Sequence, residues 1–180
     1  MTGDDQGAAA PGAQPAAPAG ESIEEARFGI RAQYLKDISF ENPNAPLIYT
    51  KLNAQPDIAV SVDVQARPLE GRTYETVLSA TVDAKFDQTQ GFLIELQYGA
   101  LVQVSEQVAP QDLEPLLLVE IPRFIFPFAR DLISSATQNG GFPPLLVAPI
   151  DFSKLYLRHK TQQGQPAAQP AGQPSAQPSD

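Results

Sequence analysis

Three long stretches between residues 58 and 104, in which apolar and polar residues alternate, constrain the fold of this chain more than any other feature. Side chains of a strand point alternately to the two faces of a sheet, so this alternation predicts strands that are buried on one face. The connections near 68–72 and 87–91 are short and polar, which is typical of antiparallel neighbours. We therefore expect a three-stranded antiparallel meander with strands at 58–66, 74–86 and 92–104.

A fourth alternating stretch, at 28–40, precedes the meander. The loop that follows it, 41–56, contains three prolines, and proline resists both helix and central strand. We expect the first strand to join the same sheet across this long loop, which gives a four-stranded antiparallel sheet.

The period of the apolar residues changes after residue 105. Apolar residues recur at helical spacing in 111–119 and again in 124–138, and Gly140-Gly141 provides a helix stop. Residues 142–150 form a Pro-containing linker, and Asp151 is placed to cap a short final helix over 151–160. Strands followed by helices predict an α+β fold in which the C-terminal helices pack to one side of the sheet.

The two ends of the chain differ from the region between them. Residues 1–22 are rich in Ala, Gly and Pro, and residues 161–180 consist mainly of Gln, Pro, Ala, Ser and Gly. Neither end has enough apolar surface to offset the entropy lost on ordering. We predict disordered tails at 1–22 and 161–180 around a single domain at 23–160.

Charge and composition exclude several classes of protein. The net charge is −9 at pH 7, and all but three of the acidic residues lie between 21 and 160. Nucleic acids and anionic membranes are unfavourable partners for such a chain, because both are bound through clustered Lys and Arg. The N-terminus lacks the pattern of a secretory signal and no apolar run could span a bilayer, so we expect no membrane insertion and a cytoplasmic location.

The sequence contains no catalytic constellation. There is no cysteine, the single histidine is His159 near the C-terminal end, and no nucleophile, phosphate-binding or zinc-hydrolase motif occurs. We expect no enzyme activity, no metal and no cofactor. The acidic residues fall mostly on the polar side of the strands, where solvated faces explain them.

Large apolar residues are more abundant than a domain of this size can bury. The loop 41–56 contains Leu47, Tyr49 and Leu52, and the segment 124–128 contains three Phe residues. Any one of them is most simply a core residue. Taken together, they predict an apolar surface that faces a partner subunit or a bound chain.

Four segments of the chain closely resemble the protein-export chaperone family SecB: YLKDISFENPNAP (34–46), FLIELQYGAL (92–101), IPRFIFPFARDLI (121–133) and GGFPPLLVAPIDFSKLY (140–156). The resemblance covers about 27–160, with the segments in the same order and at similar spacing. It implies a SecB-like fold that assembles as a homotetramer, a dimer of dimers. It also implies a cytoplasmic molecular chaperone without cofactors, which binds unfolded or newly synthesised preproteins, keeps them competent for export and delivers them to the SecA ATPase.

The resemblance also assigns roles to residues at matching positions. It implies a client-binding groove between the loop after the first strand and the long helix, at Leu47, Tyr49, Leu52, Phe124, Phe126 and Phe128. It implies SecA binding on the sheet, at Asp37, Glu41, Leu93 and Glu95. It further implies that the tetramer assembles through the opposite face of the strand that carries Leu93 and Glu95, at Ile94, Leu96 and Tyr98.

The chain departs from the family pattern at two places. Ala54 occupies a loop position where the family often has Trp, and the C-terminal tail carries Asp180 as its only acidic residue. Two alternatives stay open. One is a SecB-like chaperone dedicated to a single partner such as an antitoxin, and the other is a small-molecule binding protein or enzyme.

Overall fold

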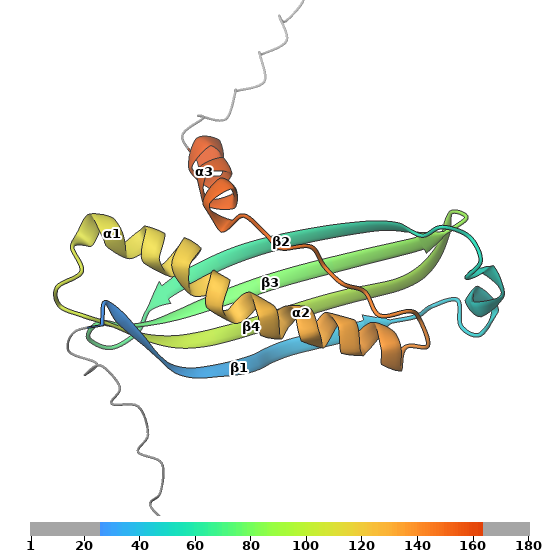
Figure 1. Ribbon diagram of the computed structural model, residues 1–180, viewed down its shortest axis with the longest axis horizontal. Helices are drawn as coiled ribbons and strands as arrows, with labels where there is room; N and C mark the ends of the chain where they lie inside the picture. Colours follow the sequence, from blue (N-terminus) through green and yellow to red (C-terminus); the bar gives the residue numbers. More distant parts are fainter. Residues whose placement is uncertain (1–25, 164–180) are drawn as a thin grey trace, which may run out of the picture.

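The computed structural model describes residues 26–163, and its four strands form one antiparallel sheet covered on one face by a long helical segment (Figure 1). The strands are β1 (Phe28–Glu41), β2 (Asp57–Pro68), β3 (Thr73–Phe86) and β4 (Thr89–Val104), in the spatial order β1-β4-β3-β2. The meander predicted from the alternation is therefore confirmed. β1 joins it at the outer edge of β4, across the long loop.

The alternation of the strands separates two faces of the sheet. Leu78, Val82 and Ile94, with even numbers on β3 and β4, are fully buried on the face that we call the inner face. Thr81, Asp83 and Glu95 lie on the opposite, outer face, and these three side chains are half-buried or exposed. The register places Val82 opposite Ile94, so apolar side chains pair across the strands throughout the inner face.

One continuous helical segment crosses the inner face (Figure 1). It consists of α1 (Pro110–Pro115), a π-helical turn η2 (Leu116–Glu120) and α2 (Ile121–Asn139). The sequence predicted two helices, 111–119 and 124–138, with an interruption between them, and the structure replaces the interruption by the π-turn. Ile125, Ala129 and Ile133 of α2 are buried against the sheet.

Because of Pro122, one backbone carbonyl of the π-turn lacks a hydrogen-bond donor within the helix. In π-helical spacing the carbonyl of Leu117 would accept a hydrogen bond from the N–H of residue 122, but proline has none. The hydroxyl of Thr76, fully buried on β3, donates to this carbonyl instead, at 3.3 Å. The sheet thus satisfies a polar group that the helix leaves without a partner.

The crossover loop between β1 and β2 contains a short 3-10 helix, η1 (Leu47–Lys51), and packs at the C-terminal end of α2. Gly140 ends α2, as predicted, and Gly141 adopts a positive φ of 79°. The ring of Phe142 then enters an aromatic cluster with Phe40, Tyr49, Phe86 and Phe92.

The last helix, α3 (Phe152–Gln163), follows an extended linker (Figure 1), and its His159 Nδ1 lies 3.6 Å from Asp63 Oδ1 on β2. The backbone N–H of Lys154 donates to Asp151 Oδ1 at 3.1 Å, which confirms the predicted cap. The helix continues three residues past the predicted domain end at 160. The predicted tail 1–22, and 164–180 of the other tail, lie outside the described residues.

Candidate functional site

The outer face of the sheet brings together the four residues that the family resemblance placed at a SecA contact. Glu41 is directly opposite Leu93, and Ser39 is opposite Glu95 across the β1–β4 pair. Asp37 is opposite Gln97, two residues further along. Asp37, Glu41 and Glu95 are exposed, and Leu93 is half-buried between them. We call Asp37, Glu41, Leu93 and Glu95 the acidic patch.

Sequence reasoning missed a further carboxylate beside the acidic patch. Asp83 on β3 lies opposite Leu93, so it shares the outer face with the patch. Its carboxylate accepts a hydrogen bond from Gln90 Nε2 at 2.7 Å and lies 3.6 Å from Lys85 Nζ. The shared parity of Asp83 with the other polar residues of β3 was the signal that could have found it.

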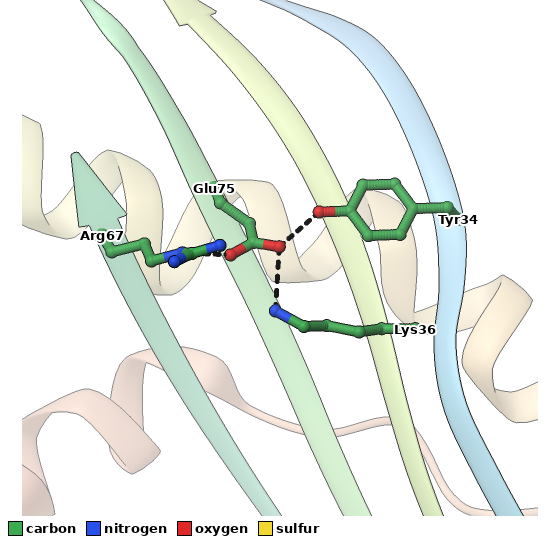
Figure 2. Close-up of polar contacts among 4 residues, drawn as sticks. All are labelled: Tyr34, Lys36, Arg67 and Glu75. Atoms are coloured by element: carbon green, nitrogen blue, oxygen red, sulfur yellow. Dashed lines mark hydrogen bonds and ion pairs between the residues drawn. The ribbon is translucent and has the colours of Figure 1, made fainter. Parts of the chain in front are cut away.

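A second polar cluster lies next to the acidic patch on the outer face, centred on Glu75 of β3 (Figure 2). Lys36 Nζ from β1 donates to Glu75 Oε1 at 3.0 Å, and Arg67 Nε from β2 donates to Glu75 Oε2. The Tyr34 hydroxyl also donates to Glu75 Oε1. Although it lies on the polar side of its strand, Glu75 is only 4% exposed. We call Tyr34, Lys36, Arg67 and Glu75 the Glu75 cluster.

Two backbone features allow residues of β1 to reach Glu75 across the intervening strand β4. The pairing of β1 with β4 shifts between Leu35 and Asp37, so Lys36 is the extra residue of a bulge. The Tyr34 ring crosses β4 above Gly99, where an added Cβ would lie 2.7 Å from the ring. Only glycine leaves room for this crossing.

The contacts within the Glu75 cluster fix the charge of its members. The hydrogen bond from Tyr34, with those from Lys36 and Arg67, lowers the pKa of Glu75 from 4.5 to about 2, although its burial acts in the opposite direction. Burial raises the pKa of Tyr34 to about 12, and the hydrogen bond to Glu75 and the negative charge of Glu75 act in the same direction. At neutral pH the cluster therefore contains one carboxylate and two cations.

The structure divides the six predicted groove residues between two places. Leu47, Tyr49 and Leu52 lie in the crossover loop at the C-terminal end of α2, whereas Phe124 lies near its start. The rise of a helix separates Phe124 from Gly140 by about 24 Å. These residues therefore lie at different positions along the length of α2.

The three crossover-loop residues differ in their exposure. Leu47 is 75% exposed, while Leu52 packs against the core. The Tyr49 hydroxyl donates to the carbonyl of Gly140 at 2.8 Å and accepts from Asn42 Nδ2 at 2.9 Å. Tyr49 thus holds the loop against the end of α2 and still leaves part of its ring exposed.

The three Phe residues of α2 point in different directions. Phe124 and Phe128 are 54% and 51% exposed; Phe124 packs on Phe28 of β1, and Phe128 stacks on Tyr98 of β4. Phe126 is buried on the other side of the helix against Phe152. Buried in this way, Phe126 contributes to the contact between α2 and the start of α3.

The predicted tetramer-interface residues lie beneath the chain's own helix. Ile94 and Leu96 have essentially no exposed surface, and Tyr98 is covered by Phe128. Their apolar row is therefore part of the intrachain core. Leu35 and Ile38, which face the same way on β1, are left exposed beyond the helix.

An open apolar groove that sequence reasoning missed runs along β2. It has a volume of about 580 Å³ and lies between the strand and the linker, with Val60, Val62, Leu146 and Ile150 in its walls. Val60 and Leu146 are exposed despite their apolar side chains. The linker at 142–150 was predicted only as a connection, since its extended sequence carries no periodic pattern.

Among residues 26–163, no helix has both the length and the apolar character required to cross a membrane. Within the same described part of the chain, no group of three or more potential ligand side chains could hold a metal ion.

Comparisons with known proteins agree on one family. The family model described as preprotein translocase subunit SecB matches residues 21–163. A protein-export protein SecB from Rhodospirillum centenum is 44% identical over 135 residues, which cover 75% of this chain and 80% of the relative. Another, from Afipia carboxidovorans, is 40% identical and covers 83% of this chain and 92% of the relative.

A solved structure shares the fold at much lower sequence identity. It is a SecB-like chaperone from Mycobacterium tuberculosis in complex with a peptide from the HigA1 antitoxin. The match has a TM-score of 0.60 and 13% identity, and covers 69% of this chain and 91% of the other.

Proposed function

Because the chain belongs to the SecB family of protein-export chaperones, we propose that it holds unfolded preproteins in its apolar grooves and delivers them to SecA from the outer face of its sheet. The family is one of chaperones rather than enzymes. The observation that carries the proposal is the separation of two exposed surfaces, one apolar and one acidic. We also expect the protein to act in the cytoplasm.

Client binding is supported by apolar side chains that the chain leaves in water around open grooves. Val60 and Leu146 flank the groove along β2, and Leu47 extends from the crossover loop. Such surfaces favour any exposed apolar segment without reading its sequence, because burial of apolar area is nondirectional. A folded client has no such segment to offer, so binding selects unfolded chains.

SecA docking is supported by the arrangement of the acidic patch. Its carboxylates come from two adjacent strands and are exposed on one face, away from the apolar grooves. A basic segment of SecA would find there several negative charges held in fixed positions by the sheet. Client and motor can therefore be bound at the same time on different faces.

Assembly as a homotetramer, a dimer of dimers, is the third part of the proposal. Phe124 and Phe128 on α2, and Leu35 and Ile38 on the edge strand β1, are exposed apolar residues. These residues suit contact between copies of the chain, because they lie on an unpaired strand edge and on an apolar helix side. Ile94, Leu96 and Tyr98 would support such an interface from below.

Size-exclusion chromatography with light scattering tests the chaperone function and the assembly together. The protein would be examined alone, with a chemically unfolded preprotein, and with the same preprotein after folding. We expect a particle of about four chain masses that co-elutes only with the unfolded form. A monomer that binds neither form would contradict the proposal.

A chaperone dedicated to one antitoxin is the alternative within the same fold. The fold neighbour bound to an antitoxin peptide is too distant in sequence to transfer its partner. Competition between two unrelated unfolded preproteins separates the alternatives. Mutual displacement at similar concentrations supports a general chaperone, while binding of neither supports a dedicated one.

A further inference from the structure

We propose that Glu75 is a positioning residue for SecA docking: it retains Lys36 and Arg67 within the sheet and offsets their charge, so that the adjacent acidic patch presents an uncompensated negative surface. The inference rests on the proposed docking of SecA at the acidic patch. It adds a buried residue outside that patch, and it assigns the residue an electrostatic role.

Of the two cations of the Glu75 cluster, Lys36 lies close enough to the acidic patch to weaken it. Lys36 adjoins Asp37 in the sequence, and Gln97, opposite Asp37, lines one shallow cavity of about 310 Å³ with Lys36, Arg67 and Glu75. Neighbouring strands are about 4.8 Å apart. Lys36 adjoins Asp37 and so lies within the screening length of about 8 Å at physiological ionic strength, whereas Arg67 lies on β2, three strand spacings or about 14 Å from β1, and acts on the patch more weakly.

Glu75 is built to hold both cations at once. Each carboxylate oxygen accepts from a different cation, Oε1 from Lys36 at 3.0 Å and Oε2 from Arg67. The Tyr34 hydroxyl donates a third hydrogen bond, and the Tyr34 ring lies between the carboxylate and β1 (Figure 2). The contacts fix the direction in which Lys36 and Arg67 extend, although their side chains are partly exposed.

Removal of the Glu75 charge would change the outer face in two ways. Lys36 and Arg67 would lose their partner, and Lys36 would be free to turn toward Asp37, its neighbour in the acidic patch. The local net charge would also rise by one. Both changes disfavour a basic segment of SecA, while the apolar grooves on the other side of the molecule are unaffected.

The test is the affinity of purified SecA for the full chain, its E75Q variant and a matched control, E106Q. Glu106 is a highly exposed residue in the loop after β4, so E106Q removes the same charge away from the outer face. We expect E75Q to weaken binding about fivefold at low salt and much less at 0.5 M salt. E106Q and the binding of an unfolded preprotein should stay within twofold of the unmodified protein.

Rescue distinguishes an electrostatic role from a structural one. The triple variant K36Q/R67Q/E75Q removes the two freed cations together with the carboxylate, and we expect its SecA affinity to return to within twofold of the original. Weakened binding by E75Q without this rescue would overturn the inference, because it would indicate a change of shape. If E75Q does not fold, the K36Q/R67Q variant replaces it. We then expect this variant to bind SecA more tightly than the unmodified protein, and equal or weaker binding would contradict the inference.

The acidic patch itself provides the separate test of docking. A D37N/E41Q/E95Q variant that binds SecA weakly, beside an E75Q variant that binds normally, would reject the role of Glu75 and retain the docking proposal. Normal binding by both variants would reject the docking surface, and the inference with it.

Discussion

The inner and outer faces of the sheet are built from the same strands, yet the chain uses them in opposite ways. On β4, Leu96 is buried beneath α2, whereas its neighbour Glu95 is exposed on the outer face. The inner face is covered by the chain's own helix and stabilises the fold. The outer face is left uncovered and carries fixed charge, which makes it the surface available to a polar partner.

The largest expected effect is a difference in stability between substitutions on the two faces of β4. L96A removes a side chain that is 1% exposed under α2, so we expect it to lower the free energy of unfolding by about 2–5 kcal/mol. L93A, the same substitution on the outer face, should cost no more than about 1 kcal/mol, because Leu93 is half-buried. Urea denaturation measures both. Equal losses would contradict the assignment of the faces.

A smaller loss of stability is expected at Gly99, where the Tyr34 ring passes close to the backbone of β4. G99A places a Cβ against the Tyr34 ring and should destabilise the fold by about 1–3 kcal/mol, since the ring and its hydrogen bond to Glu75 must shift. In a Y34A background the same substitution should cost much less. A double-mutant cycle in urea measures the coupling between Gly99 and Tyr34. Additive effects of the two substitutions would show that the fold does not depend on the passage of the Tyr34 ring over Gly99.

A third effect, of similar size, depends on pH and isolates the buried charge of the outer face. Since the pKa of Glu75 is lowered to about 2, its contribution to stability is present above about pH 4.5 and is lost as the pH falls toward 2. We expect the difference in unfolding free energy between the unmodified protein and E75Q to be about 1–3 kcal/mol at pH 7 and to shrink over that range. Urea denaturation of both from pH 7 to pH 2.5 measures it. A constant difference would contradict the role of the charge.

The comparison of faces also shows how far the sequence alone could go. Alternation predicted the four strands and the residues that share the outer face, because the period of two is a property of the backbone, and the short connections predicted the antiparallel meander. It also grouped Ile94, Leu96 and Tyr98 on one face. It could not tell whether the chain's own helix or a second copy of the chain covers them, since either kind of contact requires apolar residues at these positions.

Other features depend on contacts that no local pattern records. Glu75 looked like a solvated residue because its burial arises from Tyr34 and Lys36 on a strand two positions away in the sheet. The π-turn depends on Pro122 together with Thr76, which lies far away in the sequence. The groove along β2 needs the path of the linker, and an extended segment gives no signal of where it runs.

The central claim is that client and SecA bind to different faces of the same molecule. The most direct test measures the affinity of the D37N/E41Q/E95Q variant for an unfolded preprotein and for SecA in parallel. We expect SecA binding to weaken at least about tenfold, with preprotein binding unchanged within twofold. Unchanged SecA binding, or equal loss of both partners, would contradict the account.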